Sequence, residues 1–170
     1  MITKIFGAAL IIFGCGGVGF SMIQNYKREE KALEELLRAI EWMILELNYR
    51  MPPLAVLCRD ASKIHNGVVS QVLDKFSREL DQQVTPDVSA CMHAALSTSS
   101  NLPEFARIQL KQLGTSLGGF DLQGQLSELE GAAKRCRNEL EIMRNGREGR
   151  LQNYQTLGLC AGAALVIFLL

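Results

Sequence analysis

The sequence contains few of the residues from which catalytic and metal sites are usually built. Its 170 residues include only two histidines, and its five cysteines are widely spaced, with no C-x-x-C pair. An odd number of scattered cysteines argues against a disulfide framework and against a redox or zinc motif. No Walker, H-E-x-x-H or G-x-S-x-G sequence occurs, which removes the commoner ATPase, zinc-protease and serine-hydrolase classes.

An excess of charge of either sign is also missing. Eighteen basic and eighteen acidic residues give a formal net charge of zero. Binding of nucleic acid generally requires a strongly basic face. We therefore expect no nucleic-acid partner.

The titratable side chains that are present do not indicate catalysis. His65 stands beside a predicted turn, and His93 lies two positions from Cys91, so on a helix these last two side chains would point to different faces. Acidic pairs such as Glu34-Glu35 lie among Lys and Arg, where i,i+4 pairing and solubility explain them. We predict that the protein is not an enzyme and holds neither a cofactor nor a metal.

A long uncharged run lies near each end of the chain. Ile5 to Ile23 is an uncharged run of about nineteen residues, which as a helix would nearly cross a hydrocarbon core of roughly 30 Å. Residues 151–170 are also uncharged, and their most apolar part begins at Leu157. We predict a transmembrane helix at residues 1–23 and another at 151–170, with the lipid bilayer as a partner.

The first of these segments is open to three other interpretations. Residues 14–19 spell G-x-G-x-x-G, but a dinucleotide-binding fingerprint needs a βαβ unit, and a charged helical pattern follows here instead. Residues 12–15 partly resemble a lipoprotein cleavage site, although Phe13 is bulky and apolar sequence continues beyond Cys15. A cleaved secretory signal would need an A-x-A-like site, which is missing.

The small residues of the first segment have a simpler use in a membrane helix. Cys15 and Gly19 form one small-xxx-small pair, and Gly17 and Ser21 form another. Such pairs let a second helix approach closely. We predict that these four residues pack against another transmembrane helix.

Basic residues next to the two apolar ends predict the orientation. They are Lys27, Arg28, Lys31, Arg144, Arg147 and Arg150. Only Lys4 and the α-amino group lie on the far side. By the positive-inside rule the region between the spans is cytoplasmic and both termini lie across the membrane.

The central region, residues 24–150, has helical spacing of apolar residues throughout. The predicted helix boundaries are the prolines after Met51, the turn at Asn66-Gly67, the start signal at Thr85-Pro86-Asp87, the first-turn Pro103 and the break at Gly118-Gly119. Nothing in this region shows the alternation of a strand. The predicted fold is all-α, an antiparallel helical bundle between N- and C-terminal transmembrane helices.

The last helix of this region carries the most regular stripe. Its members alternate spacings of four and three: Leu122, Leu126, Leu129, Ala133, Cys136, Leu140 and Met143. Such a stripe requires a partner helix, which is either the first amphipathic helix of the same chain or a second copy in a homo-oligomeric coiled coil. Residues 144–150 then lose the stripe and contain two glycines, which indicates a flexible neck or an interfacial helix turn.

Several motifs, taken in order, resemble the stage III sporulation protein AB family of endospore-forming bacteria. They are Gly7 and Gly19-Phe20 in the first span, residues 46–54 (ELNYRMPPL), residues 113–121 (LGTSLGGFD) followed by Gln125, and residues 154–158 (YQTLG). The resemblance covers nearly the whole chain. It also implies a soluble domain similar to the cytoplasmic domains of F-type platform proteins of type II secretion systems.

The family resemblance implies a function. The chain would be a structural and assembly subunit of the channel complex between mother cell and forespore, in the mother-cell membrane around the forespore. Its implied first partner is the secretion-type ATPase of the same operon. We predict that partner subunits bind the loop-rich side that holds Tyr49 to Pro53 and Gly114 to Asp121, because two helix boundaries with Pro and Gly lie there, far along their helices from the membrane. The candidate contact residues are Tyr49, Pro53, Leu117, Gly118, Asp121 and Gln125, and the alternative for each is that it only stops or starts a helix. A membrane-anchored regulatory or sensor protein is the alternative, on the strength of the stripe and the neck.

Overall fold

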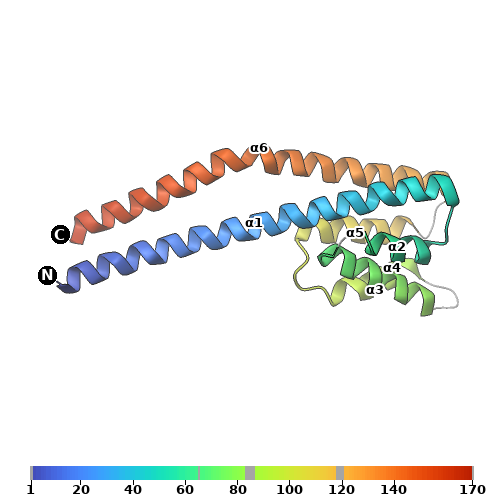
Figure 1. Ribbon diagram of the computed structural model, residues 1–170, viewed down its shortest axis with the longest axis horizontal. Coiled ribbons are helices and arrows are strands. Elements are labelled where there is room, and N and C mark those ends of the chain that lie inside the picture. Colours follow the sequence, from blue (N-terminus) through green and yellow to red (C-terminus); the bar gives the residue numbers. More distant parts are fainter. Residues whose placement is uncertain (1, 65, 83–86, 118–120, 170) are drawn as a thin grey trace. The chain divides into compact units, whose positions relative to one another are not determined.

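The protein is helical throughout the part of the chain that the computed structural model describes (Figure 1). Its backbone is described for residues 2–64, 66–82, 87–117 and 121–169. Its side chains are described for residues 24–64, 66–82, 87–117 and 121–146. No strand occurs within the described backbone, which confirms the predicted all-α class.

The described backbone forms two very long helices and four short ones. They are α1 (Ile2–Arg50), α2 (Leu54–Ser62), α3 (Val68–Gln82), α4 (Val88–Ser97), α5 (Glu104–Ser116) and α6 (Leu122–Leu169). The order agrees with the helices predicted from the sequence. The predicted break at Gly118-Gly119 lies outside the described residues.

The residues that start and stop these helices are the expected ones. Asp87 is the N-cap of α4, where its Oδ1 accepts hydrogen bonds from the amides of Ser89 at 3.0 Å and Ala90 at 3.2 Å. Pro53 and Pro103 are the N-caps of α2 and α5. Prolines suit these positions because the first amides of a helix have no partner within it.

The chain divides into two compact units. One unit consists of residues 1–28 with 141–170, and the other of residues 29–140. The domain boundaries predicted from hydropathy, after residues 23 and 150, remain predictions.

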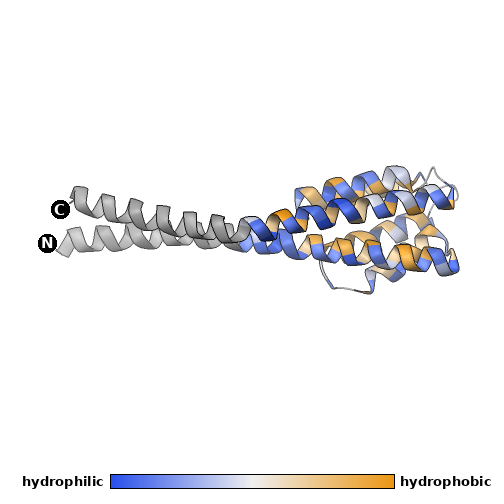
Figure 2. Cartoon of the chain, turned by 90° about the horizontal axis from the view of Figure 1, so that it is seen from above, coloured by the Kyte–Doolittle hydropathy of each residue, from blue (hydrophilic) through white to orange (hydrophobic). Residues whose placement is uncertain are grey.

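The unit of residues 29–140 has a continuous apolar core. Its fully buried side chains come from every helix of the bundle and include Leu36, Ile40, Leu57, Phe76, Met92, Leu110, Leu129 and Cys136. Figure 2 shows hydrophobic and hydrophilic positions interleaved along the described helices, as expected where each helix buries one face. Burial of each such side chain contributes about 1.5–3 kcal/mol.

Glu35 corrects one prediction. We expected it on a solvated charged face, but its side chain is only 9% exposed, and its Oε1 accepts a 2.8 Å hydrogen bond from the Ser70 amide. This carboxylate therefore caps the N-terminus of α3 from another helix, where negative charge is favoured. The cap also explains Gly67, since a Cβ there would lie 2.0 Å from Glu35 Oε2.

Residues 144–150, for which the sequence predicted a flexible neck or an interfacial helix turn, are helical, so their backbone lacks the interruption that a flexible neck would need. The backbone of α6 continues as helix through these residues to Leu169. Glycine is tolerated inside a helix at a cost of about 1 kcal/mol relative to alanine. Two glycines were therefore not enough to end the helix.

The predicted membrane spans fall outside the residues whose side chains are described. This holds for residues 1–23, with Cys15, Gly17, Gly19 and Ser21, and for residues 151–170. Within the residues that are fully described, no helix has the length and apolarity needed to cross a membrane.

Candidate functional site

The corner between α1 and α2 is the first of two turns that contain the predicted contact residues. Helix α1 ends at Arg50, and Met51 has a φ of 49°, in the left-handed region that non-glycine residues rarely adopt. Pro52 and Pro53 follow, and the Pro53 carbonyl accepts the first hydrogen bond of α2, from the Leu57 amide at 3.0 Å. The prolines thus stop one helix and start the next within three residues.

Large apolar side chains are exposed at this corner. Leu45 is 59% exposed, Tyr49 is 85% exposed and Met51 is 63% exposed. Leu45 and Tyr49 are four residues apart and share one face of α1, whereas Met43 and Leu47 are buried. The last turns of α1 therefore carry apolar side chains on an exposed face as well as on the face that Met43 and Leu47 bury in the core. We call Leu45, Tyr49 and Met51 the corner patch.

Polar groups beside the corner patch are satisfied within the chain. Glu46 and Arg50 form an i,i+4 ion pair at 3.2 Å, and the Asn48 side-chain Nδ2 donates to the Ile44 carbonyl at 2.9 Å. The exposed apolar side chains thus have a polar border, as binding surfaces commonly do.

The turn between α5 and α6 holds the other predicted contact residues, and its polar side chains cap helices. Asp121 Oδ1 accepts a 3.0 Å hydrogen bond from the Gly124 amide, so Asp121 caps the start of α6. Gln125 Nε2 donates to the Leu117 carbonyl at 3.1 Å, at the end of α5. Asp121 is exposed and Gln125 is half-buried. The structure thus gives both residues a role in stabilising the turn. Gly118 lies outside the described residues.

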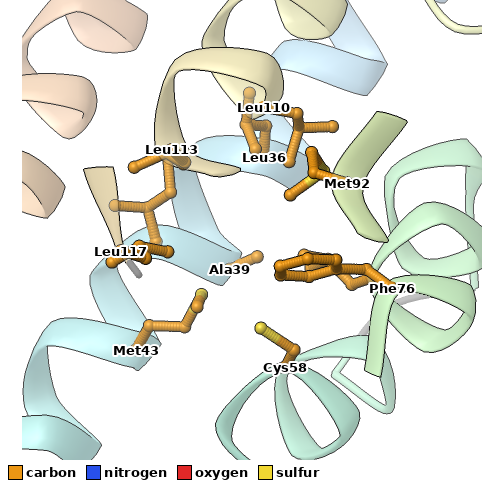
Figure 3. A pocket seen from close by; sticks show the side chains of 11 residues that line it. Leu36, Ala39, Met43, Cys58, Phe76, Met92, Leu110, Leu113 and Leu117 are labelled. Atoms are coloured by element: carbon orange, nitrogen blue, oxygen red, sulfur yellow. The ribbon is translucent and has the colours of Figure 1, made fainter. Parts of the chain in front are cut away.

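Leu117 belongs to the core. Its side chain is 3% exposed and lines a cavity of about 10 Å³ together with Phe76 and Met92 (Figure 3). A water molecule needs about this much space, in a polar setting, whereas all eleven lining residues are apolar. The cavity is a small packing gap rather than a ligand site.

The two turns lie at the same end of the bundle (Figure 1). Arg137 of α6 and Glu41 of α1 form an ion pair at 2.6 Å. From this pair α1 runs nine residues to its end and α6 runs back fifteen residues to its start, which correspond to about 14 Å and 22 Å of helix. The structure therefore brings Tyr49 and Pro53 to the same end as Asp121 and Gln125.

Leu45 is the member of the corner patch that the sequence did not predict as part of the contact surface. Leu45 stands between Met43 and Leu47, which are buried, and its place on a different face of the helix from theirs was the available signal. Met51 lies within the predicted stretch Tyr49 to Pro53, although it was not singled out as a contact residue. Pro53, which was predicted, is exposed and acts as the N-cap of α2.

The described cysteines are poor nucleophiles. Burial raises the pKa of the Cys58 thiol to about 12 and that of Cys136 to about 11. Burial, followed by the charges of Glu79 and Asp87, also raises the pKa of Cys91. At neutral pH these thiols are protonated and unreactive. His93 is exposed while Cys91 is buried, so the two point to different faces, as predicted.

Comparisons with known proteins agree on one family. The family model described as stage III sporulation protein AB matches residues 4–170. Stage III sporulation protein AB of Bacillus subtilis (strain 168) is 22% identical over 169 residues, which cover 98% of this chain and 99% of that protein. A solved structure of a stage III sporulation protein AB is similar with a TM-score of 0.63 at 18% identity, over 72% of this chain and 98% of the other. At this identity, the structural likeness shows the fold alone.

Proposed function

This chain belongs to the stage III sporulation protein AB family, and from that membership we propose that it is a non-catalytic assembly subunit of a membrane complex made during sporulation. In this proposal its apolar ends anchor it in the bilayer, and the helical domain presents the corner patch to a partner. The exposure of Leu45, Tyr49 and Met51 at one end of the bundle carries the proposal.

Membrane anchoring is supported by the distribution of charge along the sequence. The uncharged residues 5–23 and 151–170 are each preceded or followed by basic residues on the side of the central region. Such flanks accompany cytoplasmic loops. We place the protein in the mother-cell membrane surrounding the forespore, with residues 24–150 in the cytoplasm.

Docking at the corner patch is supported by the chemistry of its side chains. Aromatic residues such as Tyr49 are enriched among the residues that contribute most to binding, and exposed methionine adapts to different partners. Met51 stays in a conformation that costs a non-glycine residue about 1–2 kcal/mol. An exposed, strained methionine between a helix end and two prolines is more readily explained by contact with a partner than by stability.

The partner we propose is the secretion-type ATPase of the sporulation channel. In the family resemblance this subunit is a membrane platform for such an ATPase. A cytoplasmic ATPase would reach the end of the bundle that carries the corner patch if the two long helices enter the membrane at their opposite ends.

The orientation is tested with a membrane-impermeant thiol reagent on intact cells that express single-site variants. Ile2→Cys should be labelled from outside, whereas Gln71→Cys on the exposed face of α3 should be labelled only after lysis. The wild-type chain supplies the baseline, because its described cysteines are buried. Labelling of Gln71→Cys in intact cells would exclude direct contact with a cytoplasmic ATPase.

Partner docking is tested by co-purification of the ATPase with the full chain from sporulating cells. Tyr49→Ala should reduce recovery of the ATPase several-fold or more, since truncation of a central aromatic contact costs roughly 2 kcal/mol or more of binding free energy. Ile108→Ala is the matched control, because Ile108 is an exposed apolar residue on α5. Equal recovery with both variants would refute the corner patch as the docking surface.

A further inference from the structure

The two units of the chain carry opposite net charges, although the whole chain is neutral. Residues 1–28 with 141–170 contain six basic and two acidic residues, a net charge of +4. Residues 29–140 contain twelve basic and sixteen acidic residues, a net charge of −4. Balanced composition therefore hides a concentration of positive charge in the unit that includes the apolar ends.

Most of this positive charge is confined to two short segments. Five of the six basic residues lie at positions 27, 28, 144, 147 and 150, close to the apolar residues 5–23 and 151–170. The side chains of Lys27, Arg28 and Arg144 are exposed. Figure 2 shows α1 as hydrophilic where its described side chains begin.

A hydrogen bond joins these two segments. Tyr26 of α1 donates from its hydroxyl to the Met143 carbonyl of α6 at 2.6 Å, across 117 residues of sequence. Each partner is followed directly by a basic residue, Lys27 in one helix and Arg144 in the other. We call Lys27, Arg28 and Arg144 the basic collar, because the Tyr26 bond holds the two helices together at this level.

The unit that contains the collar has a net positive charge, because its sequence holds six basic residues and two acids, Glu141 and Glu148. Lys and Arg next to a membrane attract anionic headgroups, and Tyr is enriched at the same depth.

We propose that the basic collar binds the phosphate groups of anionic phospholipids, so that the protein selects these lipids from the surrounding bilayer. The proposal rests on the membrane anchoring argued above and adds a ligand class to it. Lipid is the ligand because the collar lies within a few residues of both apolar segments in the sequence. The Tyr26 hydrogen bond positions the collar by joining its two halves.

The test reconstitutes the full chain in phosphatidylcholine vesicles and measures its association with spin-labelled phosphatidylglycerol and phosphatidylcholine by electron paramagnetic resonance. The wild-type chain should prefer the anionic lipid by roughly threefold or more at low salt, and the preference should decline as salt screens the charges. The variant Lys27→Gln with Arg28→Gln and Arg144→Gln should show a ratio near one.

A matched control removes the same number of charges elsewhere. Lys63→Gln with Lys111→Gln and Lys134→Gln changes three exposed cations of the other unit and should leave the preference intact. Tyr26→Phe keeps every charge but removes the hydroxyl, so a reduced preference in this variant would support the positioning role. An equal loss in the control triple variant would overturn the collar.

Free phosphate is distinguished from lipid by adding inorganic phosphate at matched ionic strength. It should not abolish the preference, and specific competition by it would contradict lipid as the ligand. A chain that alkaline carbonate removes from the vesicles would overturn both the anchoring and the collar. A chain that stays inserted and prefers neither lipid would overturn the collar alone.

Discussion

The turn between α1 and α2 exposes apolar side chains, whereas the turn between α5 and α6 uses its side chains to hold helices in place. Tyr49 and Met51 extend from the first turn, and the backbone of Met51 is strained. In the second turn Asp121 and Gln125 cap helix ends and Leu117 fills the core. Neighbouring turns at one end of a bundle can thus differ, one exposing apolar side chains and the other using its side chains to stabilise helix ends.

The largest difference between the turns is expected from truncating one residue of each. Leu117→Ala should lower the free energy of unfolding by about 2–5 kcal/mol, because it empties part of a packed core. Tyr49→Ala should change it by less than about 0.5 kcal/mol. Thermal unfolding of the full chain in detergent measures both, and comparable losses would remove the distinction.

A second prediction concerns how tightly α5 is seated just before its turn. A Cβ at Gly114 would lie 2.5 Å from Met92 Cβ on α4, so Gly114→Ala should destabilise the protein by about 1–3 kcal/mol. At Gly131 a new Cβ would meet only the flexible Arg135 guanidinium at 3.3 Å. There the same substitution should stabilise the helix by up to about 1 kcal/mol, so two changes of the same sign would contradict the prediction.

A third prediction separates capping from contact at Asp121. Asp121→Ala should cost about 1 kcal/mol because the Gly124 amide loses its acceptor, and Asp121→Ser should retain most of the stability. Co-purification of the ATPase should be normal with the serine variant. Loss of the partner despite an intact cap would instead assign a contact role to this carboxylate.

The smallest effect is expected at Met51, where stability and binding should change in opposite directions. Met51→Gly should raise the free energy of unfolding by roughly 0.5–1 kcal/mol, because glycine adopts positive φ without strain. It should also weaken recovery of the partner, since the side chain is lost. Met51→Ala keeps the backbone strain, so it should weaken recovery of the partner without the gain in stability. Unchanged recovery of the partner with both variants would exclude a contact role for Met51.

The sequence predicted the helices because their boundaries depend on local chemistry. Pro52, Pro53, Pro103 and Asp87 act within one turn of their own positions, so their meaning is visible without a fold. The Glu35 cap was missed because its donor, the Ser70 amide, is 35 residues away in the sequence. The spacing of residues in α1 does not indicate that the N-terminus of α3 lies beside Glu35.

The candidate site was only partly predictable for a similar reason. Tyr49 and Asp121 were both selected because they lie at helix boundaries on one loop-rich side, yet local sequence does not tell which turn directs its side chains outward. Leu117 was interpreted as part of a turn beside Gly118-Gly119, and its burial follows from the packing of α5 on α4 and α1. Exposure of Leu45 likewise depends on which faces of α1 the short helices cover.

Site-specific photo-crosslinking in sporulating cells tests the corner patch most directly. Benzoylphenylalanine would replace Tyr49 in the corner patch, Gln123 at the α5–α6 turn and Ile108 on α5, each in an otherwise unchanged full chain. We predict a crosslink to the secretion-type ATPase from position 49 that is absent from position 108 and weaker from position 123. Crosslinks from positions 108 or 123 with none from position 49 would contradict docking at the α1–α2 corner.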